Sequence, residues 1–84
     1  MAKVEITPTA QKQIEELPGG IVQRVLSVIE RLPKWPDVSG AKPLKGNRSG
    51  QFRLRTGDFR LIVRPVGDVV YVLEVGNRKD VYEE

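Results

Sequence analysis

The sequence predicts an α+β fold in which a short strand and two helices come before a run of three antiparallel strands. Two observations carry this prediction. Apolar residues recur at helical spacing up to residue 32, with a Pro-Gly-Gly break between two such segments. The second half holds three strand-like runs separated by Gly-Asp pairs, which are typical of tight turns. The expected order is β-α-α-β-β-β, with the two-helix hairpin packed on one face of a small, mostly antiparallel sheet.

The N-terminal half supplies the first strand and both helices. Residues 3–7 alternate between polar and apolar side chains and predict a short strand. Thr7-Pro8-Thr9 then predicts a helix start, because a hydroxyl caps free amide groups and proline tolerates the first turn. Pro18-Gly19-Gly20 ends that helix. An apolar stripe predicts the second helix, and it comprises Val22, Val25, Leu26, Ile29 and Leu32.

The C-terminal half predicts strands over residues 51–56, 59–65 and 69–76, after a loop rich in proline and glycine over residues 33–50. Gly57-Asp58 is typical of a two-residue hairpin turn. This turn would place Leu54 opposite Leu61, facing the helices, and Arg55 opposite Arg60 on the other face.

In the second hairpin, strand alternation favours a three-residue loop, Val66-Gly67-Asp68. That loop would pair Leu61 with Leu73 and Val63 with Tyr71. A two-residue loop would instead turn Glu74 toward the helices. Glu74 is therefore expected beside Arg60, on the face away from the helices.

Composition narrows the possible functions. With 84 residues and no internal repeat, the chain has room for one domain, residues 1–84. It contains no cysteine and no histidine, which excludes disulfides, thiolate zinc sites and imidazole acid–base catalysis. The N-terminus has no apolar run long enough for a signal peptide or a membrane span, so a cytoplasmic protein without a membrane partner is expected.

Cations gather in one part of the chain, although the net charge is only +3. Residues 42–64 contain a single acid, Asp58. The cations in the same stretch are Lys42, Lys45, Arg48, Arg53, Arg55, Arg60 and Arg64. Like charges directly opposite each other destabilise a sheet, so the predicted register calls for a counter-charge. Either these arginines only solvate an exposed face, or they bind a polyanion. Guanidinium groups match phosphate oxygens, which favours a nucleic-acid backbone.

Four segments stand out in order along the chain, and they are KPLKG (42–46), FRLR (52–55), GDFRLI (57–62) and VGNRKDVY (75–82). Together they resemble the RelE branch of the RelE/ParE toxin superfamily. The resemblance spans nearly the whole chain. It implies a RelE-like fold and a type II toxin that arrests growth by inhibiting translation. The implied activity is that of an mRNA interferase, a ribosome-dependent endoribonuclease that cuts mRNA in the A site when the 2′-hydroxyl attacks the scissile phosphate. It implies no metal and no small-molecule cofactor. The implied partners are a cognate antitoxin, the ribosome and mRNA.

The resemblance also implies a set of catalytic residues, which are Arg53, Arg55, Arg60, Arg78 and Tyr82. Arg60 and Arg78 would hold the scissile phosphate and stabilise its transition state. Arg53 or Arg55 would assist the 2′-hydroxyl or the leaving oxygen, and Tyr82 would stack on a base or relay a proton. Four further cations are candidates for RNA binding, and they are Lys42, Lys45, Arg48 and Lys79. Lys42 and Lys45 would either touch RNA phosphates or merely solvate the loop.

This sequence departs from the family pattern at three positions. Several relatives carry histidine at the position of Asn77, and others carry lysine at Arg53 and Arg55. Two other functions therefore stay open. One is a ParE-like inhibitor of DNA gyrase that cuts nothing, and the other is a relative that binds RNA or the ribosome with little cleavage.

Overall fold

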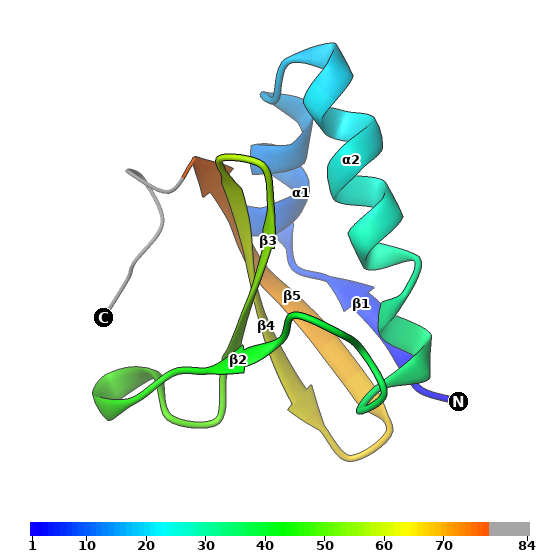
Figure 1. Cartoon of the computed structure of the whole chain (residues 1–84), viewed down its shortest axis with the longest axis vertical. Coiled ribbons are helices and arrows are strands. Elements are labelled where there is room, and N and C mark those ends of the chain that lie inside the picture. The colour runs from blue at the N-terminus through cyan, green and yellow to red at the C-terminus, as the bar shows by residue number, and fades with distance from the viewer. Residues whose placement is uncertain (78–84) are drawn as a thin grey trace.

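A computed structural model describes residues 1–77 of the chain (Figure 1). The elements follow in the order β1 (Lys3–Ile6), α1 (Pro8–Glu15), α2 (Gly19–Ile29), β2 (Lys42–Pro43), β3 (Phe52–Thr56), β4 (Phe59–Val66) and β5 (Val69–Asn77). Short 3-10 turns at Leu32–Lys34 and Gly46–Arg48 interrupt the loops. The strands form one sheet in the order β1-β5-β4-β3-β2, with β1 parallel to β5 and the other pairs antiparallel. The α+β class and the mostly antiparallel sheet are confirmed, whereas β2 was expected to be loop.

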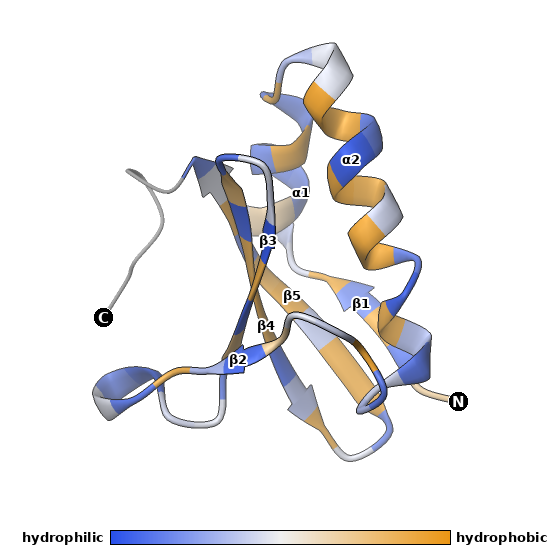
Figure 2. Cartoon of the chain, viewed as in Figure 1, coloured by the Kyte–Doolittle hydropathy of each residue, from blue (hydrophilic) through white to orange (hydrophobic). Residues whose placement is uncertain are grey.

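One hydrophobic core joins both helices to one face of the sheet. Leu54 and Leu61, which the Gly57-Asp58 turn was predicted to point at the helices, are 1% and 0% exposed. They pack with buried residues of α1, α2 and β5 in a single cluster. In Figure 2, α2 alternates between apolar and hydrophilic residues, as expected for a helix that covers a core with one side. No helix within residues 1–77 has the length and apolar character needed to cross a membrane.

The start of α1 is fixed by Thr7, as the sequence predicts. Its Oγ1 accepts a hydrogen bond from the backbone amide of Ala10 at 3.2 Å. The same hydroxyl donates to the backbone carbonyl of Val72 in β5 at 2.9 Å. One side chain therefore caps the helix and ties it to the sheet.

Replacing Thr7 with Ala is expected to lower the free energy of unfolding by about 1–2 kcal/mol, because the change removes both a helix cap and a part-buried hydrogen bond. Urea denaturation followed by circular dichroism measures this loss. Thr9→Ala is the matched control, since Thr9 is exposed and lies inside the helix rather than at its cap. Equal stability losses in the two variants would contradict the role given to Thr7.

The second hairpin differs from the prediction. The expected three-residue loop is wrong, because Val66 pairs with Val69 and leaves the two-residue turn Gly67-Asp68. Leu61 pairs with Val75 rather than Leu73, and Val63 pairs with Val72 rather than Tyr71. Between them, Ile62 pairs with Glu74.

The two-residue turn accounts for the Val63–Val72 pair, and a β-bulge in β5 accounts for the Leu61–Val75 pair. Between the Val63–Val72 and Ile62–Glu74 pairs, β5 contains one extra residue, Leu73. An inserted residue reverses the alternation of side chains beyond it. Val72 and Val75 therefore both face the helices and are 0% and 2% exposed, while Glu74 still faces away despite the shorter turn.

The face of the sheet turned away from the helices, here called the open face, is partly covered by the loop after β2. Leu44 from this loop is 7% exposed and packs with Ile62 and Leu73. Arg48 Nη1 lies 2.5 Å from Glu74 Oε2 and donates to Gln51 Oε1 at 3.2 Å. Glu74 is thus on the predicted face, but its ion-pair partner is Arg48.

Candidate nucleic-acid interface

The register of the sheet places the predicted cations in two adjacent rows on the open face. Paired residues of neighbouring strands point to the same side of a sheet. One row crosses β2, β3, β4 and β5 and contains Lys42, Arg53, Ile62 and Glu74. The next row crosses β3, β4 and β5 and contains Arg55, Arg60 and Gly76. The predicted pairing of Arg55 with Arg60 is confirmed.

These cations differ in their exposure. Lys42 and Arg55 are exposed, and Arg53 is half-buried. Arg60 is only 3% exposed, so its side chain lies beneath the surface rather than on it. A buried guanidinium still contributes its charge to the local field, and low-dielectric surroundings strengthen that contribution. Arg55 and Lys42 are therefore the cations of the two rows that a ligand reaches first.

A pocket of about 180 Å³ opens beside these residues at the edge of β3. Its lining consists of Arg31, Ser39, Gly40, Lys42, Arg53, Leu54 and Arg55. Four of these residues are cations and none is an acid. Three of the cations were predicted as site residues from the sequence. The fourth, Arg31, was missed, because nothing local separates it from the other polar residues of the predicted second helix.

The other predicted site residues lie elsewhere. Arg48 is held by Glu74 and Gln51, and neither Arg48 nor Lys45 lines the basic pocket. Arg78, Lys79 and Tyr82 lie outside the described residues. The structure thus brings Lys42, Arg53 and Arg55 together, with Arg60 in the adjacent row.

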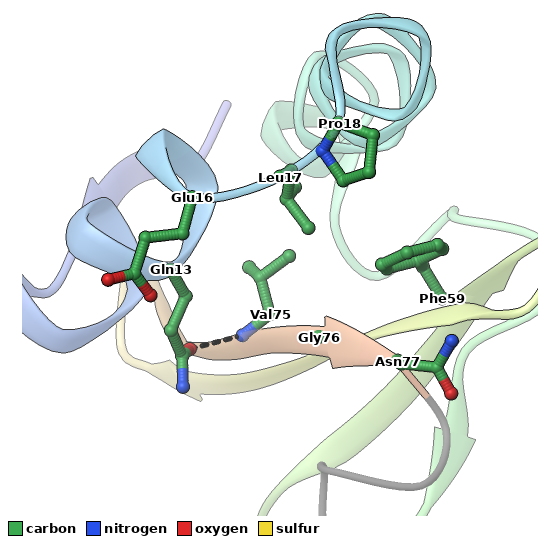
Figure 3. Close-up of a pocket in the computed structure, with 8 residues that line it drawn as sticks. All are labelled: Gln13, Glu16, Leu17, Pro18, Phe59, Val75, Gly76 and Asn77. Carbon is green, nitrogen blue, oxygen red and sulfur yellow. Dashed lines mark hydrogen bonds between the residues drawn. The ribbon is translucent and has the colours of Figure 1, made fainter.

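A larger pocket of about 360 Å³ lies at the end of β5, on the helix side (Figure 3). Its lining comes from the end of α1, the start of β4 and the end of β5, and it consists of Gln13, Glu16, Leu17, Pro18, Phe59, Val75, Gly76 and Asn77. Gln13 Oε1 accepts a hydrogen bond from the backbone amide of Val75 at 2.7 Å. Among residues 1–77, the lining contains one acid, Glu16, and no cation, so these residues do not supply the positive charge that phosphate binding requires.

Comparisons with known proteins agree on one family. A family model described as the ParE toxin of the type II toxin-antitoxin system parDE matches residues 4–82. Toxin RelE3 of Methanocaldococcus jannaschii is 27% identical over 85 residues, which cover 96% of each protein. A chain of the RelBE2 toxin-antitoxin complex from Mycobacterium tuberculosis has a TM-score of 0.80 and 30% identity, over 92% of this chain and 98% of that chain.

A chain of the RelB-RelE antitoxin-toxin complex from Methanococcus jannaschii superposes with a TM-score of 0.77 at 25% identity, over 93% of this chain and 94% of that chain. The residues matched by the family model include both helices, nearly all of the sheet and the cations described above. On this evidence the chain belongs to the RelE/ParE superfamily of type II toxin-antitoxin toxins and falls on its RelE-type branch.

Proposed function

We propose that this toxin is an mRNA interferase, a ribosome-dependent endoribonuclease that cuts mRNA in the ribosomal A site. The observation that carries the proposal is the arrangement of cations in two adjacent rows on the open face of the sheet, namely Lys42 and Arg53 in one row and Arg55 and Arg60 in the next. Attack of a 2′-hydroxyl on the neighbouring phosphate passes through a pentacovalent transition state with extra negative charge. Preorganised guanidinium groups stabilise such charge without a metal ion or another cofactor.

The residues take different roles in this proposal. Arg55 is exposed and contacts the scissile phosphate from the open face, and Arg60 adds positive charge from below. Arg78 contributes a further charge, and Tyr82 stacks on a base or relays a proton. Arginine is a poor proton acceptor, so Tyr82 or a ribosomal group takes the proton of the 2′-hydroxyl as its oxygen bonds to phosphorus. The bond from phosphorus to the 5′-oxygen of the next nucleotide breaks, and that oxygen leaves with a proton from the same relay or from water. Lys42, with Lys45, Arg48 and Lys79, binds phosphates farther along the RNA.

A cognate antitoxin is part of the same proposal. The similar chains from M. tuberculosis and M. jannaschii occur in complexes with antitoxins. A segment that combines an amphipathic helix with acidic side chains would fit the basic open face and neutralise its repulsion. The toxin would act in the cytoplasm, where translating ribosomes present the mRNA.

Primer extension on mRNA from cells that express the chain tests this function. In-frame cuts at A-site codons are the expected result, and Arg60→Ala and Tyr82→Phe are each expected to relieve growth arrest. Breaks in DNA that depend on gyrase would instead identify a ParE-like inhibitor. Tight ribosome association without any cut would identify a binding protein, and either of these results would overturn the proposal.

A further inference from the structure

The basic pocket, the one lined by Arg31, Lys42, Arg53 and Arg55, lies where β2 is missing, because β2 begins only at Lys42. The two residues of β2 pair with Arg53 and Phe52 only. Continued in the same register, the strand would place Gly40 opposite Arg55. Gly40 instead has a φ of 85°, which turns the chain away from the sheet edge. Within the described residues, the pairing position beside Arg55 is left without a strand, and the pocket lies there.

The backbone of β3 offers a donor at this position. In a two-residue hairpin the residues that flank the turn, here Thr56 and Phe59, bond to each other, so peptide groups along the strand point alternately to the two sides. Arg55 then presents its N–H away from β4, toward the pocket. The contact from the Leu44 amide to the Gln51 carbonyl at 2.9 Å agrees with this alternation, because Gln51 also points away from β4.

The pocket collects charge from three separate parts of the fold. Arg31 comes from the residues that follow α2, and its own amide donates to the Val28 carbonyl at 3.1 Å, which fixes its backbone. Lys42 comes from β2, and Arg53 and Arg55 come from β3. A cleft lined by charges of one sign raises the local concentration of ions of the opposite sign. The pocket therefore suits a negatively charged group.

Size and geometry select phosphate among the possible anions. A volume of about 180 Å³ is below the range of about 300–1,000 Å³ typical of sites for whole small molecules. A carboxylate is planar, and one guanidinium group satisfies it in a bidentate pair. A tetrahedral phosphate has oxygens in several directions, which suits donors that come from β2, β3 and the segment after α2.

We propose that this pocket is a second phosphate subsite, which holds the RNA phosphate next to the scissile one, and that Arg31 positions the RNA by binding it. The claim that the bound phosphate belongs to RNA rests on the proposed function. The claim that the pocket binds phosphate does not. Arg31 acts away from the reacting bond. Its contribution is to binding and register rather than to the chemical step.

Titration of the full chain with inorganic phosphate, followed by nuclear magnetic resonance of the backbone and arginine side-chain N–H groups, tests the subsite. Saturable shifts are expected at Arg31 and Arg55. Arg31→Gln should weaken phosphate binding about tenfold, the effect of losing one charge-assisted hydrogen bond. The matched control is Arg24→Gln, which removes the same charge from an exposed residue of α2 that does not line the pocket, and it should change affinity less than about twofold.

Three outcomes would overturn the subsite, namely shifts that do not saturate, equal weakening by Arg31→Gln and Arg24→Gln, or acetate binding as tightly as phosphate. The last outcome would identify a receptor for acidic protein side chains. Arg31 and Arg24 are both exposed, so both variants should melt at the temperature of the wild type.

Cleavage assays on programmed ribosomes separate this proposal from the proposed function. Arg31→Gln should raise KM and leave kcat unchanged, because the subsite binds substrate and transition state alike. If phosphate binds at the pocket but the wild type cuts no mRNA, the nuclease function fails and the phosphate site stands. If the wild type cuts mRNA and Arg31→Gln behaves as Arg24→Gln in both assays, the subsite fails and the function stands.

Discussion

Replacing Arg55 with Gln is expected to slow mRNA cleavage about 10²–10³-fold and to abolish growth arrest, because it removes a preorganised charge from the transition state. Arg55 belongs both to the row that contains Arg60 and to the lining of the basic pocket. Its side chain is exposed, so the substitution should leave the fold intact. Single-turnover cleavage on programmed ribosomes measures the rate, and colony counts after induction measure growth arrest.

Arg64→Gln provides the matched control for this experiment. Arg64 is exposed, lies on β4 and shares the strand face of Arg60, but it does not line the basic pocket. The control variant should cut mRNA at nearly the wild-type rate. Equal losses in the two variants would mean that only the overall positive field matters, and wild-type activity of Arg55→Gln would remove this residue from the site.

The parts of the fold that depend on short-range chemistry could be predicted from the sequence. Thr7 and Pro8 specify the start of α1, because the cap hydroxyl and the fixed φ of proline act within one turn. Gly57 specifies the first hairpin in the same way, since its φ of 61° suits a two-residue turn. The register of β3 against β4 follows from that turn alone, and with it the pairing of Arg55 with Arg60.

The second hairpin could not be predicted by the same reasoning. The alternation rule assumes a regular strand, and the neighbouring apolar residues Val72 and Leu73 allow more than one assignment of faces. A bulge at Leu73 satisfies the core with a shorter turn. The two-residue strand β2 was missed for a related reason. Pro43 cannot donate a hydrogen bond to a sheet and reads as loop, yet proline is tolerated on an edge strand.

The residues of the candidate site also divide into those that the local sequence indicates and those that only tertiary packing brings together. Lys42, Arg53 and Arg55 belong to one cation-rich stretch, residues 42–64, so the sequence could indicate them. Arg31 reaches the pocket only through the packing of α2 on the sheet. The ion pair between Arg48 and Glu74 likewise depends on tertiary contacts over the open face. Those contacts have no signature in the local sequence.

The largest effect on stability is expected from Leu61→Ala, at about 3 kcal/mol of lost free energy of unfolding. Leu61 is 0% exposed in β4, and its cross-strand neighbours Leu54 and Val75 are 1% and 2% exposed. The truncated side chain would leave a cavity. Because β4 is hydrogen-bonded to β3 on one side and to β5 on the other, it cannot move to close that cavity. With a urea m-value on the order of 1 kcal/mol/M for a domain of this size, the denaturation midpoint should fall by more than about 1 M.

Val66→Ala is the control for this loss, because Val66 lies on the same strand and is 51% exposed. Its free energy of unfolding should change by less than about 0.5 kcal/mol, as is usual for surface substitutions. The comparison also bears on the site, since Leu61 is adjacent in sequence to Arg60 and Ile62 on the opposite face. If the two variants lost equal stability, the core would not be centred on β4, and the rows of cations on the open face would lose the rigid support that preorganised charge requires.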